Sequence, residues 1–137
     1  MSALTPVPGS LRAIFMDTTI AVAFFRQDQA VRQRLMAVDI VTSTIVTGEL
    51  YYGAYRAGYQ ARELANIAAL IAHSRIVVCD LLTSEHYGRI RDALHRQGTP
   101  IPENDIWIAA SAVQHGLPLA TRDAHFDRVP GLIVEQW

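Results

Sequence analysis

Four acidic residues spread along the chain are the side chains best suited to do chemistry, and we call them the acidic quartet: Asp17, Glu49, Asp105 and Asp123. Several carboxylates can lie close together only if they are protonated, paired with cations or bound to a metal ion. Because carboxylate oxygens are hard ligands, they favour Mg²⁺ or Mn²⁺. A site of this kind, with positions left open for phosphate oxygens, is suited to phosphodiester hydrolysis.

Three members of the quartet also have a purely structural interpretation. Asp17 follows the apolar run 13–16, and an Asp at a strand end is often a cap or a turn former. Asp105 falls in the first turn of a predicted helix, where the helix dipole favours an acid whatever its function. Asp123 could equally cap the short segment that follows it. Taken one at a time, these residues leave the structural alternative open.

Glu49 lies on a predicted helix and shares a largely apolar stripe with Ile45, Gly48 and Tyr52. Burying an ionised carboxylate without compensation is very costly, so this side chain needs a partner. An Arg or a local hydrogen bond would be the structural answer, and a shared metal ion would be the functional one.

The elements that must position these acids alternate along the chain. Short apolar runs predict strands at residues 13–16, 40–41, 76–79, 117–120 and 132–134. Helical periodicity and capping residues predict helices after Thr18 or Thr19 and over residues 28–37, 44–56, 60–73, 83–97 and 103–114, with Gly98 and Gly116 closing the last two. This alternation predicts a single-domain α/β/α sandwich with a central parallel sheet. Since ligands bind beyond the carboxyl ends of such strands, Asp17 and Asp123 fall where a site is expected.

Length and composition exclude several classes of protein. The 137 residues suit one domain, and the net charge of −1 indicates no global basic field for coating nucleic acid. All twelve basic residues are Arg, which excludes receiver-like switch domains and P-loop NTPases because both need a lysine. An aspartate-nucleophile phosphatase would need an Asp where Thr19 stands. Cys79 is the single cysteine, which excludes an internal disulfide and a cysteine-rich zinc site, and we interpret it as a buried residue at a strand end.

No targeting or membrane segment is recognisable. Residues 1–12 hold prolines and a glycine but no apolar core of a signal peptide, and we expect them to form a flexible N-terminal tail. No apolar run approaches the roughly 18 residues of a membrane span. We therefore expect a cytoplasmic protein whose folded domain covers residues 13–137.

Four sequence blocks carry a resemblance to a known family. The first is Met-Asp-Thr at 16–18, and the second is Ser-Thr-Ile-Val-Thr-Gly-Glu-Leu-Tyr-Tyr-Gly-Ala at 43–54. The third is Ile-Pro-Glu-Asn-Asp-Ile-Trp-Ile-Ala-Ala at 101–110, and the fourth is Thr-Arg-Asp-Ala-His-Phe at 121–126 followed by Val-Pro-Gly-Leu at 129–132. In this order they resemble PIN-domain nucleases, and within that superfamily the VapC-type toxins of bacterial toxin–antitoxin pairs.

The resemblance implies a Mg²⁺- or Mn²⁺-dependent endoribonuclease, usually a homodimer, that is silenced by a cognate antitoxin protein. Carried over by position, the acidic quartet becomes the catalytic and metal-binding set, with Asp17 and Asp105 the surest metal ligands. Thr121 would support the site through its hydroxyl, and Asn104 is a further supporting residue. The open carboxylates would invite an Arg from the antitoxin. The alternative is a catalytically silent PIN-like binding or structural module in a complex.

Three further features have two interpretations each. His125 is interpreted as a surface residue beside a buried Phe126, with substrate contact as the alternative. Arg89, Arg91 and Arg96 fit a solvated helix face better than a contact with RNA phosphates. The tyrosines between residues 51 and 59 fit the core or a dimer contact better than a base-stacking platform.

Overall fold

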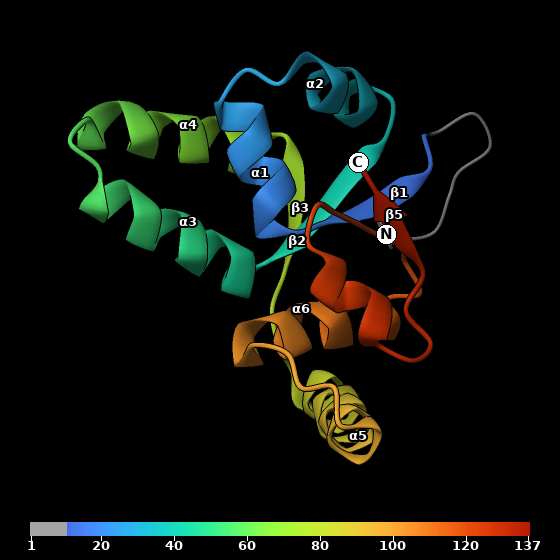
Figure 1. Cartoon of the computed structure of the whole chain (residues 1–137). Helices are drawn as coiled ribbons and strands as arrows, with labels where there is room; N and C mark the ends of the chain where they lie inside the picture. The colour runs from blue at the N-terminus through green and yellow to red at the C-terminus, as the bar shows by residue number, and fades with distance from the viewer. Residues whose placement is uncertain (1–10) are drawn as a thin grey trace.

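The computed structural model describes residues 11–137 and contains one five-stranded, fully parallel sheet with the strand order β3-β2-β1-β4-β5. Figure 1 shows the strands fanned through the middle of the molecule. They are β1 (Ala13–Met16), β2 (Asp39–Ser43), β3 (Ser74–Val77), β4 (Leu119–Thr121) and β5 (Val134–Gln136). The predicted α/β/α sandwich with a central parallel sheet is confirmed.

The helices connect successive strands and cover the sheet. They are α1 (Thr18–Phe25), α2 (Gln29–Met36), α3 (Thr44–Arg56), α4 (Gln60–Ala72), α5 (Leu81–Gln97), α6 (Glu103–Gln114) and the short 3₁₀ helix η1 (Ala124–Arg128). In the view of Figure 1, α5 and α6 pack together below the sheet, while α1, α2 and α4 lie above it. Parallel strands need such crossovers, and both faces of the sheet are buried as a result.

The centre of the core is β1, whose Ile14, Phe15 and Met16 are fully buried. This strand pairs with β2 on one side and β4 on the other, so its continuous apolar run is protected on every side. The burial explains why the run was recognisable as a strand from the sequence. It also places Asp17, the next residue, at the end of the central strand of the sheet.

The structure shifts β3 by two residues from the predicted 76–79. Its register is set by β2, with Ile40 opposite Ser74 and Ser43 opposite Val77, and both strands end together. Cys79 therefore lies beyond the strand and is half-buried, so its interpretation as a buried strand-end residue is wrong. Because β3 is an edge strand, its residues need not all be apolar. The apolar run 76–79 therefore did not mark the position of the strand.

Arg12, near the start of the described residues, contacts residues of two strands. Its guanidinium forms two hydrogen bonds with the Glu135 carboxylate, at 2.7 and 2.8 Å, and its carbonyl accepts from the backbone N–H of Asp39. The rest of the predicted flexible tail, residues 1–10, lies outside the described residues. Within the described part of the chain, every helix is too short or too polar to cross a bilayer.

Candidate active site

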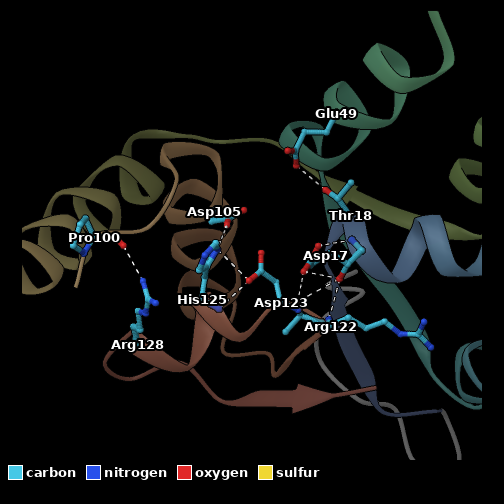
Figure 2. Close-up of polar contacts among 11 residues, drawn as sticks. Asp17, Thr18, Glu49, Pro100, Asp105, Arg122, Asp123, His125 and Arg128 are labelled. Atoms are coloured by element: carbon cyan, nitrogen blue, oxygen red, sulfur yellow. Dashed lines mark hydrogen bonds and ion pairs between the residues drawn. The ribbon is translucent and has the colours of Figure 1, made fainter. Parts of the chain in front are cut away.

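The sheet brings two members of the acidic quartet to the same edge. Asp17 directly follows β1, and Asp123 comes two residues after β4, its hydrogen-bonded neighbour. Asp105 approaches from the first turn of α6, and Glu49 from α3. Figure 2 shows these carboxylates gathered around one region, although they come from four separate segments of the chain.

Asp17 is held more tightly than the other three. Its side chain is 2% exposed and caps α1 by accepting a hydrogen bond from the backbone N–H of Thr19 at 2.6 Å. The prediction that Thr18 or Thr19 caps this helix is therefore wrong. Asp17 is the last residue with extended backbone, and the N-cap is the residue that flanks the first helical position.

Two threonine hydroxyls complete the contacts of Asp17. Those of Thr19, at 3.1 Å, and of Thr121 both donate to its second carboxylate oxygen. The Thr121 hydroxyl also accepts from the Asp123 backbone N–H at 2.9 Å, and that of Thr19 accepts from the Arg122 N–H at 3.0 Å. Together they tie the start of α1 to the loop after β4. Sequence reasoning considered Thr19 only as a possible helix cap and gave it no role in supporting the site.

Burial raises the pKa of Asp17 above its ordinary value, and the nearby charge of Asp123 raises it further. The hydrogen bonds from Thr121 and Thr19 oppose this shift because they stabilise the ionised form. A carboxylate in this position keeps its charge only with the help of these donors or of a cation.

Asp123 and Asp105 face His125. Asp123 caps η1 by accepting from the His125 backbone N–H at 2.9 Å, so the structural interpretation of Asp123 as a cap is also correct. The imidazole Nδ1 lies 3.1 Å from an Asp123 oxygen and 3.6 Å from an Asp105 oxygen. Among residues 11–137, these three residues form the group whose ligand atoms all lie within 4.8 Å of one another. The sequence interpretation of His125 as a mere surface residue is therefore incomplete.

Asp105 has the strongest sign of crowding. Burial, followed by the negative charges of Asp123, Asp17 and Glu49, raises its pKa from 3.8 to about 6. Its side chain is 16% exposed, so solvent screens the repulsion poorly. Because all three other acids contribute to this shift, the quartet acts as one electrostatic unit.

The carboxylate of Glu49 accepts a hydrogen bond from the Thr18 hydroxyl at 2.6 Å. It borders a hollow of about 270 Å³ between α1, α3 and α4, which Arg26 and Glu63 also line. Within residues 11–137, no Arg lies within ion-pair distance of any member of the quartet. The Arg partner that would have given Glu49 or Asp105 a purely structural role is therefore not found in the described part of the chain.

Two other predicted features lie apart from this centre. Asn104 is exposed on the first turn of α6, and its supporting role stays a prediction. The arginines of α5 are exposed and pair with surface acids: Arg89 with Glu85 at 2.7 Å, Arg96 with Asp92 at 2.8 Å, and Arg91 with Glu103 of α6 at 3.4 Å. Their interpretation as a solvated helix face is confirmed.

A parallel sheet with crowded carboxylates beyond its central strands is the arrangement that the sequence blocks predicted, and comparison with known proteins agrees. The PIN domain family model matches residues 14–132, and the chain belongs to this family.

Two named relatives make the likeness more specific. Ribonuclease VapC2 of Haemophilus influenzae is 38% identical over 74% of this chain and 77% of its own length. The tRNA(fMet)-specific endonuclease VapC of Salmonella typhimurium is 35% identical over 89% of this chain and 96% of its own. The resemblance to VapC-type proteins is confirmed.

Solved structures agree with the fold. VapBC2 of Rickettsia felis, crystallised with a DNA fragment from its promoter, superposes with a TM-score of 0.85 at 26% identity, over 91% of this chain and 98% of the other. DNA-bound VapBC of Salmonella typhimurium superposes with a TM-score of 0.82 at 29% identity, over 91% and 97%.

Proposed function

We propose that this chain is a metal-dependent endoribonuclease and the toxin of a toxin–antitoxin pair. The observation that carries the proposal is the acidic quartet, four carboxylates from separate elements that crowd together without an Arg partner among the described residues. The names of the VapC relatives, which are ribonucleases or tRNA endonucleases, support the reaction class.

The residues present fit a divalent cation. The donor set consists of hard carboxylate oxygens, and a buried imidazole nitrogen beside them lacks a hydrogen bond within the described chain. We propose that Asp17, Glu49, Asp105 and Asp123 hold Mg²⁺ or Mn²⁺. Such an ion, when bound, polarises the phosphate and lowers the pKa of the attacking water.

The protein's own side chains keep these donors in place. Thr121 and Thr19 hold both oxygens of Asp17 in one orientation, and Thr18 directs the carboxylate of Glu49. Supporting hydrogen bonds of this kind fix ligand geometry and are worth tenfold to a hundredfold in metal affinity or activity. A catalytically silent binding module would have no need for a crowded and repulsive set of this kind.

An RNA cleavage assay tests the activity. The purified protein should cleave RNA with Mn²⁺ and stop when EDTA is added. Asp17→Asn should abolish cleavage while the circular dichroism spectrum stays native, because the amide is a neutral and poorer ligand. Asp92→Asn, on the exposed face of α5, is the matched control and should keep full activity. Unchanged cleavage by Asp17→Asn would refute the assignment.

An antitoxin is the second partner that we propose besides RNA. A solved structure that this fold resembles, VapBC-5 of Mycobacterium tuberculosis, belongs to the VapBC family of toxin–antitoxin systems. Crowded carboxylates also suit a guanidinium, which binds them in a fork. We expect the antitoxin to place a basic side chain near Asp17 and Asp105. Expression of this chain alone should arrest growth, and Asp105→Asn should relieve the arrest. Harmless expression of the native chain would remove the toxin role and leave the nuclease role standing.

We propose that the chain forms a homodimer through the exposed tyrosines of α3 and Tyr59, which precedes α4. Tyr52, Tyr55 and Tyr59 are 68%, 63% and 71% exposed, and exposed apolar patches mark sites of protein–protein contact. Light scattering at micromolar concentration should give twice the chain mass, and Tyr55→Glu should lower it. A monomer at every concentration would refute this assembly.

A further inference from the structure

His125 has a partly exposed imidazole ring whose Nδ1 atom is buried. Its side chain is 40% exposed, yet Nδ1 is screened from solvent and has no hydrogen bond to any residue in the range 11–137. That nitrogen points at Asp123 and Asp105, as Figure 2 shows. A polar atom buried without a hydrogen bond is costly, so this orientation calls for an explanation.

The position of His125 is built into the fold. Its backbone N–H donates to Asp123, and the following residue, Phe126, is 1% exposed and anchors η1 in the core. Asp105 reaches the same place from α6, twenty positions earlier in the chain. The imidazole is therefore directed at the carboxylates by two separate elements, unlike a side chain that is free on the surface.

A simple ion pair explains this geometry poorly. An imidazolium paired with a carboxylate donates its N–H along a nearly straight hydrogen bond, and Nδ1 makes none here despite lying 3.1 Å from the Asp123 oxygen. Neighbouring ligands of one octahedrally coordinated ion also lie about 3 Å apart, because each would sit about 2.1 Å from the ion. In that arrangement the donor atoms point at the ion and not at each other.

We propose that Nδ1 of His125 is a metal ligand that joins Asp105 and Asp123, so that this site prefers Mn²⁺ over Mg²⁺. The inference rests on the proposed metal-dependent function and adds a nitrogen donor to the all-carboxylate quartet. Imidazole nitrogen suits transition metals, whereas Mg²⁺ favours oxygen ligands and water. His125 thereby sets which ion the site selects.

Pulsed electron paramagnetic resonance of the Mn²⁺-loaded protein tests the ligand directly. A coordinated imidazole gives a ¹⁴N coupling to Mn²⁺, which should be present in the native protein and absent in His125→Gln. The exposed His95 on α5 supplies the control, because His95→Gln should keep the coupling. Labelling the native protein with ¹⁵N-histidine should replace the ¹⁴N signal, which makes the test independent of any variant's folding.

Competition between ions gives the second measurement. The ratio of Mg²⁺ to Mn²⁺ dissociation constants should fall about tenfold in His125→Gln, a difference of about 1.4 kcal/mol in selectivity, and should not change in His95→Gln. A native Mn²⁺ protein without ¹⁴N coupling, or a coupling that survives in His125→Gln, would overturn the inference. RNA cleavage by the same native sample separates the two proposals. Cleavage without ¹⁴N coupling would refute the ligand and keep the nuclease, whereas coupling without cleavage would do the reverse.

Discussion

The outer face of α5 and the sheet edge with the acidic quartet both carry acidic residues, but of these two groups only that of α5 is paired with arginines in the described part of the chain. On α5, Glu85 pairs with Arg89 and Asp92 with Arg96, each at a spacing of four residues and with exposed side chains. The quartet lies in a partly or fully buried place, where its partners are hydroxyls, backbone N–H groups and one imidazole.

The difference shows how a charge site can be distinguished from charged surface. Acids on one helix can be neutralised by a basic residue one turn away, because local spacing brings the two together. Acids contributed by four elements have no such local partner, and here burial together with their mutual repulsion raises the pKa of Asp105 to about 6. Repulsion in a poorly screened place destabilises the fold. Acids with strongly perturbed pKa values of this kind are typical of functional sites.

Replacing one acid in each region should give the largest difference in RNA cleavage rate. Asp105→Asn should lower RNA cleavage at least about a thousandfold, because metal catalysis supplies several kcal/mol of charge stabilisation and each 1.36 kcal/mol is tenfold. Asp92→Asn should leave the rate within about twofold. Single-turnover cleavage at saturating Mn²⁺ makes the comparison, and equal losses in both variants would erase the distinction between the two regions.

Replacing Thr121, which positions Asp17, should reduce metal affinity and cleavage by a smaller factor. Thr121→Val removes the hydroxyl that donates to Asp17 and accepts from the Asp123 N–H, so metal affinity and cleavage should fall roughly tenfold to a hundredfold. Thr121→Ser keeps the hydroxyl and should restore most of both. Mn²⁺ titration by calorimetry measures the affinity, and a valine variant that binds like the native protein would show that the hydroxyl is dispensable.

The crowding of Asp105 should appear as a pH dependence of stability in the metal-free protein. Its folded-state pKa lies above the ordinary value, so the folded state binds the proton more tightly than the unfolded state. The free energy of unfolding should therefore fall by roughly 1–3 kcal/mol as pH rises from about 4 through about 6, and should level off above about 7.

Asp105→Asn should lack this part of the slope and should be the more stable protein above pH 6. Urea unfolding of both proteins at several pH values gives the difference between the two curves. Parallel curves across the whole range would mean that Asp105 is not crowded.

The ion pairs of α5 should show the smallest effect. Asp92→Asn breaks an exposed pair at i,i+4 spacing and should cost about 0.3–0.5 kcal/mol. The loss should shrink further in high salt because the charges are screened. Thermal unfolding at two salt concentrations measures it, and a cost of several kcal/mol would show that this face is not ordinary solvated surface.

The sequence was informative wherever local pattern decides structure. The buried run of β1 predicted a strand because a central strand must be apolar on both faces, and it placed Asp17 at the sheet edge. Gly98 predicted the end of α5 because it takes the left-handed conformation, with φ of 70°. The alternation of such elements was enough to predict the parallel sheet.

Features set by contacts between distant segments were not predictable. Thr and Asp are both common N-cap residues, so the sequence alone did not distinguish Asp17 from Thr18 and Thr19. Asp17 is the N-cap because the extended backbone of β1 ends there. The hidden nitrogen of His125 depends on the packing of η1 beside α6. Whether any Arg would reach the quartet was likewise a question of tertiary structure, which is why the structural alternative stayed open until the fold was known.

The melting temperature of native protein and Asp105→Asn, each with and without Mn²⁺, tests most directly whether the quartet is a metal site. Mn²⁺ should stabilise the native protein by about 2.7 kcal/mol at a hundredfold excess over Kd, and should stabilise the variant much less. The metal-free variant should be at least as stable as the native protein. A native melting temperature that ignores Mn²⁺, together with a metal-free variant destabilised by about 3–5 kcal/mol, would mean that Asp105 belongs to a structural ion-pair network and would contradict the account.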